Sequence, residues 1–220
     1  DKTTYSVSLN HMINNGVVKY SQNKVTRANV KVTSKMLNDD LTISIQQRSA
    51  MTKDNFSSGG STAFTFDPTQ PIYDENNEAF GGYWEWNQGL APSNPVSALE
   101  QIENIGETRR NFTSINASYK LPFVEGLAIN VVGSADFRDG KSQQFTPTTF
   151  LSGTSQLGFI SEGAQKAHTY NFEPYISYKK DIDALDGSIE LLGGYSYQET
   201  YSEAFGFFGD DLTTNVYKWN

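Results

Sequence analysis

Apolar and polar residues alternate along much of this chain. Between Thr4 and His11 the apolar residues Tyr5, Val7 and Leu9 alternate with polar ones. Because successive side chains of a β-strand point to opposite faces, this pattern predicts a strand with one apolar and one polar face. Seven stretches share the pattern and predict seven strands: 4–11, 28–36, 41–48, 113–121, 127–138, 169–179 and 189–198.

The lengths and connections of these strands point to a membrane protein. Most of the stretches are about 9 to 14 residues long, whereas strands in soluble proteins have about 5 or 6 residues. A tilted strand that crosses a bilayer needs about 9 to 11 residues. Short and long connections alternate, with turns at 37–40, 122–126 and 182–187 and longer segments at 14–24, 50–107 and 139–167. The layout predicts an antiparallel transmembrane β-barrel segment with long extracellular loops on one side.

Aromatic residues are abundant, with 12 Tyr, 14 Phe and 3 Trp, although only 37% of the chain is apolar. In membrane proteins such rings gather at the boundary between lipid and water. Eight of them are predicted to lie near strand ends, at this boundary: Tyr5, Phe112, Tyr119, Phe123, Phe137, Tyr170, Tyr178 and Tyr201. A soluble extracellular all-β binding or fibre protein would also alternate and carry aromatic rings, and it is the alternative at this point.

The composition argues against several other functions. There is no cysteine, and His11 and His168 are too separated to suggest a metal centre or a catalytic relay, so we interpret both as ordinary strand-end residues. A net charge of −8 without a Lys/Arg cluster along the chain argues against a nucleic-acid partner. No carboxylate lies in an apolar stretch that would raise its pKa for acid catalysis. We therefore predict no enzymatic activity, no cofactor and no metal.

Several motifs together resemble a known family of transporters. They are "YSVSLNHMINNGVVKYSQNKVTRANVKV", "SNPVSALEQI", "YKLPFVEGLAINVVGSADF" and "LLGGYSYQETYSEAFGFFGDDL". In their order and spacing, which cover nearly the whole chain, they resemble the barrel of SusC/RagA-type TonB-dependent transporters of Bacteroidetes. The resemblance implies a bacterial outer-membrane barrel of 22 strands that encloses an N-terminal plug. It also implies energy from the TonB complex and a SusD-like surface lipoprotein as a lid.

This chain departs from a whole transporter of that kind, since we find no leader, no plug and no barrel-closing strand in it. We therefore expect residues 1–220 to be part of a single barrel domain, with the plug and the remaining strands outside this chain. The function that the resemblance implies is the import of an oligosaccharide or a peptide, together with the lipoprotein.

The densest candidate binding motif is "PIYDENNEAFGGYWEW" in the long segment 50–107. Its rings Tyr83, Trp84 and Trp86 adjoin several carboxylates, and such a combination suits sugar rings, which stack on aromatic faces and donate hydrogen bonds from their hydroxyls to the carboxylates. The rings are candidates for ligand or lid contact, and packing within the loop is the other interpretation. The carboxylates lack the spacing of an EF-hand, so we interpret them as solvated acid.

Two further motifs are structural candidates. In "SNPVSALEQIENI", Asn94 can cap a helix and Pro95 suits its first position, while apolar residues recur as far as Ile105. The motif predicts a short helix that anchors the loop, and Asn94 and Pro95 are also candidates for substrate contact. The motif "DFRDG" at 136–140 could hold calcium but is more simply a polar entry to a loop.

Overall fold

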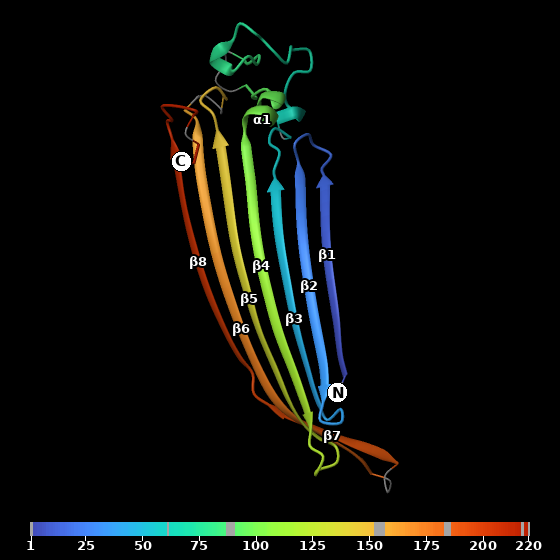
Figure 1. Ribbon diagram of the computed structural model, residues 1–220. Coiled ribbons are helices and arrows are strands. Elements are labelled where there is room, and N and C mark those ends of the chain that lie inside the picture. The colour runs from blue at the N-terminus through green and yellow to red at the C-terminus, as the bar shows by residue number, and fades with distance from the viewer. Residues whose placement is uncertain are drawn as a thin grey trace.

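The computed structural model describes residues 2–60, 62–86, 91–151, 157–182, 186–216 and 218–219. The strands form one antiparallel sheet in which β1 to β7 follow one another in chain order (Figure 1). A short helix, α1 (Pro95–Gln101), lies in the segment between the third and fourth strands. The strands are β1 (Lys2–Asn15), β2 (Gln22–Met36), β3 (Leu41–Asn55), β4 (Glu103–Lys120), β5 (Leu127–Thr146), β6 (Phe159–Ile182), β7 (Gly187–Gly194) and β8 (Tyr197–Asp210).

The last two strands, β7 and β8, are parts of a single long strand that pairs with β6. Both keep the same register with β6 on either side of a break. The break falls opposite Pro174, whose carbonyl accepts a hydrogen bond from the N–H of Tyr195 at 2.9 Å. Proline has no N–H with which to return that bond. The eight labelled strands therefore correspond to the seven predicted ones.

Several strands run further than the alternation predicted. The segment between β5 and β6 covers only 147–158, so the predicted loop 139–167 is wrong at both ends. The motif "DFRDG" lies inside β5 and not at a loop entry. The reason is that the extra strand portions carry charged residues, such as Arg109 and Lys166, on the face that is apolar further along. Backbone pairing continues there without a hydrophobic pattern that the sequence could reveal.

The register aligns the two faces of the strands across the whole sheet. On the apolar face, one row of paired residues is Tyr5, Val32, Ile45, Ile115, Gly133, Phe172 and Tyr197. The neighbouring row, on the polar face, is Ser6, Lys31, Gln46, Ser114, Ser134, Asn171 and Gln198. A slip by one residue would exchange the faces, so the alternation that predicted the strands also specifies their register.

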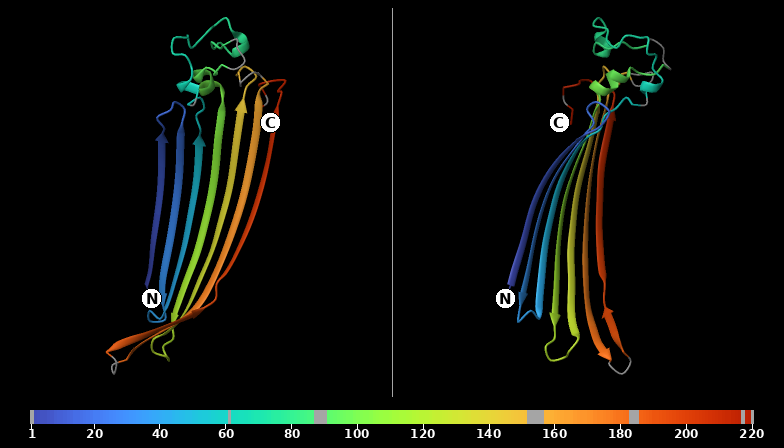
Figure 2. Two further views of the ribbon diagram at one scale, coloured as in Figure 1. Left: turned by 180° about the vertical axis from the view of Figure 1, so that it is seen from behind. Right: turned by 90° about the vertical axis from the view of Figure 1, so that its right-hand side faces the viewer.

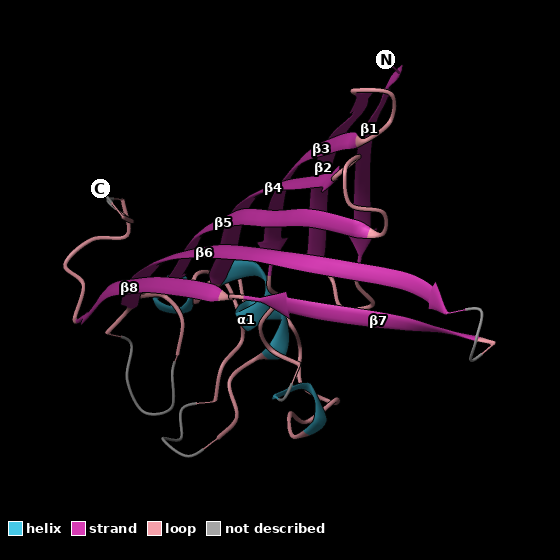
Figure 3. Ribbon diagram, turned by 90° about the horizontal axis from the view of Figure 1, so that it is seen from below, coloured by secondary structure: helices cyan, strands magenta, loops and turns pink. Residues whose placement is uncertain are grey.

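The sheet is a single open layer, as the end-on view shows (Figure 3). Side chains on its apolar face are largely exposed, at 81% for Tyr5, 77% for Leu9 and 60% for Leu191. A soluble sandwich buries this face of each sheet against a second layer. The exposed apolar face agrees with a segment of a barrel wall that faces lipid.

The two longest connections lie at one end of the sheet, together with the short β1–β2 connection (Figure 2). The β1–β2 connection, the 56–102 segment and the β5–β6 connection lie at one end, and the turns at 37–40 and 121–126 lie at the other. This confirms the predicted layout of the connections. Which end faces the outside of a membrane stays a prediction.

Several rings that were predicted at strand ends lie inside the strands. Phe137, Tyr170 and Tyr201 belong to the middle of the sheet, as does His168, and these four rings pack across β5, β6 and β8. Their centroids are separated by 5.0 Å (Phe137–His168), 5.7 Å (Phe137–Tyr170) and 6.1 Å (His168–Tyr201). The next row on this face is charged. The rings therefore lie beside the charged row that interrupts the apolar residues of this face, and the strands continue beyond it.

Candidate ligand-binding loop

All five predicted contact residues lie in the segment between β3 and β4, residues 56–102, which we call the outer loop. Part of it forms a small hairpin. Tyr73 and Tyr83 make an isolated antiparallel bridge, the N–H of Asp74 donates to the Gly82 carbonyl at 2.9 Å, and the N–H of Trp84 donates to the Ile72 carbonyl at 3.1 Å. This hairpin positions the aromatic residues beside α1.

Asn94 organises the loop from its interior. The residue is only 1% exposed, and its side-chain oxygen accepts hydrogen bonds from the N–H groups of Val96 at 3.0 Å and Ser97 at 3.4 Å. Its amide group donates to the carbonyls of Ile72 at 2.8 Å and Trp84 at 3.0 Å. One side chain thus caps α1 and ties the helix to the hairpin.

The predicted helix is confirmed at its start and is shorter than the apolar spacing suggested. Asn94 is the N-cap and Pro95 is the first residue of α1, as predicted. The helix ends at Gln101, and Ile105 belongs to β4. The loop-anchoring role of the motif follows from these bonds, whereas contact of Asn94 or Pro95 with a substrate stays a prediction.

Glu85 is a buried carboxylate in the same core of the loop. It is 6% exposed, and its Oε2 accepts a hydrogen bond from the N–H of Asn94 at 2.9 Å. Its Oε1 has no hydrogen-bond partner among the residues that the structure describes. Burial raises the pKa of Glu85, and the Asn94 N–H and the Ser97 hydroxyl oppose that rise. The sequence interpretation of this residue as solvated acid with an ordinary pKa is therefore wrong.

Glu100, on α1, joins the outer loop to the β1–β2 connection. Its carboxylate accepts hydrogen bonds from Lys19 Nζ at 2.7 Å, the Tyr83 hydroxyl at 2.7 Å and the Tyr20 hydroxyl at 3.3 Å. The Lys19 ammonium and the Tyr83 hydroxyl hold the pKa of Glu100 below its usual range. This cluster ties together two connections that are about 80 residues apart, and no local pattern along the chain indicates it.

The three candidate rings have different neighbours, and all three are half-buried. Tyr83 packs against Tyr73, with centroids 5.5 Å apart. Trp84 lies edge-on to Trp86 at 4.8 Å and to Phe66 at 6.0 Å. Sequence reasoning missed Phe66 and Tyr73 because the hairpin brings them in from up to 18 positions away. Ligand contact by these rings stays a prediction.

The outer loop offers no metal site in the part of the chain that the structure describes. No group of three or more His, Asp or Glu residues there could hold a metal ion. Of the histidines, His11 shares a hydrogen bond with the Thr26 hydroxyl at 2.9 Å, and His168 packs among aromatic rings. No helix in the part of the chain that the structure describes is long and apolar enough to span a membrane.

The single sheet with one exposed apolar face, and with its long connections at one end, defines a segment of an outer-membrane β-barrel. No family model matches the chain. Among curated proteins it is 25% identical to the TonB-dependent receptor SusC of Bacteroides thetaiotaomicron over 214 residues, covering 86% of this chain and 21% of SusC. It is 27% identical to the TonB-dependent receptor P3 of Formosa agariphila over 143 residues, covering 65% of this chain and 14% of P3.

Solved structures show the same fold. The RagAB peptide transporter superposes with a TM-score of 0.75 at 14% identity, over 99% of this chain and 25% of the matched chain. The closed-closed state of the RagAB peptide importer gives 0.71 at 15% identity, over 98% of this chain and 24% of that one. The predicted resemblance to SusC/RagA-type TonB-dependent transporters is therefore confirmed, and the chain spans about a fifth of the length of SusC.

Proposed function

We propose that this chain forms part of the wall and the outer loops of a TonB-dependent importer in the bacterial outer membrane. The imported nutrient is an oligosaccharide or a peptide, and a SusD-like surface lipoprotein takes part. The observation that carries the proposal is the apolar face, whose aligned and exposed side chains require a lipid surrounding. The names of the relatives support it, since SusC and P3 are TonB-dependent receptors and RagAB is a peptide importer.

In this function the two faces of the sheet have different surroundings. The apolar face lies against lipid, and the polar face, with rows such as Ser114–Ser134–Asn171, lines the interior of the barrel. The interior receives the plug on which the TonB complex acts. The chain supplies a rigid polar wall and contributes no chemistry to transport. The strand portions above the lipid carry the outer loop towards the ligand and the lipoprotein.

The candidate rings Tyr83, Trp84 and Trp86, together with Pro95, are the contact residues of this proposal. Asn94, which is only 1% exposed, supports them from inside the loop. Two features support that role. The hairpin and Asn94 hold the rings on a fixed support, so little conformational entropy is lost when a ligand or a lid protein stacks on them. The loop is also much longer than the about 12–15 residues beyond which ordered loops are usually functional.

The test uses the complete transporter in its own outer membrane. Deleting its gene should abolish growth on one member of a panel of oligosaccharides and short peptides, and removing TonB should do the same. A cysteine placed at Ser58 should react with an impermeant thiol reagent on intact cells, and a cysteine at Asp39 should not, because the two positions lie at opposite ends of the sheet. This chain adds no background labelling, since it contains no cysteine of its own. A protein that folds in buffer without detergent, or equal labelling at both positions, would contradict the proposal.

A further inference from the structure

Four of the five arginines of this chain lie on the polar face, in two adjacent rows. We call Arg27, Arg48, Arg110 and Arg138 the arginine cluster. Ala50 of β3 is paired with Arg27 of β2 on one side and with Arg110 of β4 on the other. Arg110 is paired in turn with Arg138 of β5. Arg48 lies in the next row, diagonal to Arg27. Four different strands contribute one arginine each, so the cluster is invisible along the sequence.

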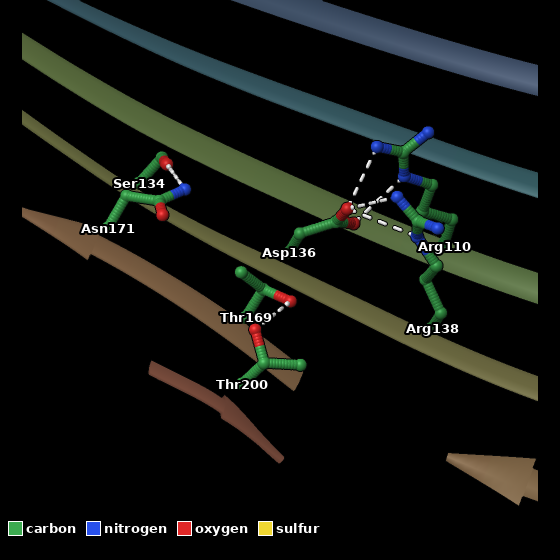
Figure 4. Close-up of polar contacts among 7 residues, drawn as sticks. All are labelled: Arg110, Ser134, Asp136, Arg138, Thr169, Asn171 and Thr200. Carbon is green, nitrogen blue, oxygen red and sulfur yellow. Dashed lines mark hydrogen bonds and ion pairs between the residues drawn. The ribbon is translucent and has the colours of Figure 1, made fainter. Parts of the chain in front are cut away.

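One carboxylate serves two of these arginines (Figure 4). Arg110 donates to Asp136 in a bidentate manner, with Nε to Oδ1 and Nη2 to Oδ2 both at 2.8 Å. Arg138 donates to Oδ2 of the same carboxylate from Nε at 3.1 Å and from Nη2 at 2.8 Å. Asp136 thus holds two like charges that face each other across neighbouring strands, an arrangement that is otherwise unfavourable.

The other two arginines have no carboxylate partner. Arg48 donates only to the neutral amide oxygen of Gln46, at 3.1 Å, and Arg27 has no ion pair with any residue in the described ranges. On the opposite face, at about the same height, Arg109 does pair with Glu107, at 2.6 Å. A chain with a net charge of −8 therefore carries an unbalanced positive cluster at one place, on the predominantly polar face.

The two unpaired arginines and Arg110 line a depression. Arg27, Arg48 and Arg110 surround it together with Ala50 and Phe112, and its volume is about 320 Å³. The planar guanidinium fork matches a carboxylate in shape and charge, and the Phe112 ring gives the depression an apolar part. Donors that point into an open, partly apolar depression suit a ligand that carries an anionic group on a larger body.

We propose that the arginine cluster is a subsite that binds carboxylate groups of the imported solute on its way through the barrel. The inference rests on the proposed function, because that function places the polar face towards the interior. Arg27 and Arg48 bind the carboxylate, while Asp136 keeps Arg110 and Arg138 in place beside it. The solute is therefore acidic, either a peptide with free carboxylates or an oligosaccharide of uronic acids.

The test measures equilibrium binding to the complete transporter in detergent by calorimetry. Each acidic probe has a neutral counterpart of equal length: an oligogalacturonide against an oligogalactoside, and a peptide with free carboxylates against its fully amidated form. The wild type should bind at least one acidic probe more tightly than its counterpart. The Arg27→Gln, Arg48→Gln double variant should bind that probe about tenfold more weakly and the neutral probe unchanged, because two charge-assisted contacts are lost.

Two further variants sharpen the result. Arg109→Gln removes the same charge from the opposite face and should leave both affinities unchanged. Arg27→Lys, Arg48→Lys keeps the charges without the planar fork and should give an intermediate loss. Equal or absent binding of acidic and neutral probes by the wild type would overturn the inference, while TonB-dependent uptake of a neutral solute would leave the proposed function standing. A double variant that lowers the amount of heat-modifiable barrel would also overturn it, because the cluster would then hold another part of the protein.

Discussion

The sheet and the outer loop are stabilised in different ways. In the sheet, backbone pairing runs along every strand, and most side chains on both faces are exposed or half-buried. In the outer loop, backbone pairing is sparse, and a few polar side chains are buried instead, among them Glu85, Asn94 and Ser97. Of these, Glu85 and Asn94 satisfy backbone groups that a ladder would satisfy elsewhere.

This difference decides what a substitution does in each region. In the sheet, the backbone hydrogen bonds do not depend on which side chain is present. A substitution there therefore changes stability according to whether its face meets lipid or the interior of the barrel. In the outer loop, single atoms such as the Asn94 amide hold two elements together, so the loss of one side chain opens the segment. The sheet should therefore respond to polarity, and the loop to the loss of particular hydrogen bonds.

The largest effect is expected from a charge on the apolar face. Val131 and Ser134 both lie in β5, on the apolar and the polar face respectively. Val131→Arg should cost about 2–4 kcal/mol of folding free energy in lipid, because the charge must enter hydrocarbon. Ser134→Arg should cost much less. Urea titration of the full-length protein refolded into lipid vesicles measures both, and Leu191→Arg with Ser196→Arg provides a second pair. Equal costs on the two faces would contradict the placement of lipid.

The next effect is expected at Asn94. Asn94→Ala removes the cap of α1 and leaves the buried carbonyls of Ile72 and Trp84 without their donor, which should cost about 2 kcal/mol in local opening of the loop. Hydrogen exchange of the α1 amides measures this cost. Asn76→Ala, at an exposed position of the same loop, is the matched control and should change little. Exchange that rises equally in both variants, or a loss of folded barrel, would show that Asn94 does not act locally.

The sequence predicted the parts of the fold that depend on a local or periodic signal. Each of the seven strands was found because lipid requires apolar residues on one face, and the start of α1 was found because Asn94 and Pro95 carry their signal in adjacent positions. The upper portions of β5 and β6 were missed because no apolar face is needed once a strand has left the lipid. Their ladders depend on backbone bonds that any non-proline residue can make.

The contacts within the candidate site were less accessible to sequence reasoning. Glu100 binds Lys19, 81 positions away, and no spacing rule links two exposed charges at that distance. Glu85 sits among acidic residues that are mostly exposed, and only the folded loop shows that it is the one enclosed. The aromatic motif itself was visible in the sequence. The packing of Tyr83 on Tyr73 and of Trp84 on Phe66 is shown only by the folded loop.

A smaller, pH-dependent effect should distinguish two carboxylates of the loop. Burial raises the pKa of Glu85 above its unfolded value, so its favourable contribution is present at low pH and is lost as the pH rises through the folded pKa. Lys19 and Tyr83 lower the pKa of Glu100, so its contribution is present above the unfolded value and is lost as the pH falls through the folded one. Protection of the loop amides, corrected for intrinsic exchange, should therefore be greatest at mildly acidic pH.

The variant that isolates the first carboxylate is Glu85→Gln, which stays neutral at every pH. It should increase protection of the loop at neutral pH and remove the decline between mildly acidic and neutral conditions. The matched variant Glu100→Gln should lose protection at neutral pH and change little at strongly acidic pH. A decline towards acid in the Glu85→Gln and the wild-type protein alike, without a maximum, would show that burial does not control Glu85.

The smallest effect on stability, with the largest effect on function, is expected from the tryptophans. Trp84→Ala with Trp86→Ala removes the two rings that pack on each other but leaves the Trp84 carbonyl that Asn94 binds. The amount of heat-modifiable barrel should stay unchanged, because loop packing adds little to the ladders of β3 and β4. Uptake, or association with the lipoprotein, should fall.

Tyr83→Phe is the control for that experiment. It keeps the ring beside Tyr73 and removes only the hydroxyl that donates to Glu100 at 2.7 Å, so it loosens the support of the loop without removing a stacking surface. A loss of uptake in the tryptophan variant alone would assign the rings to ligand or lid contact. Equal losses in both variants would mean that the shape of the loop matters and not its rings. Normal uptake and normal lipoprotein association in the tryptophan variant would reduce the aromatic cluster to packing, since nothing but the rings had been removed.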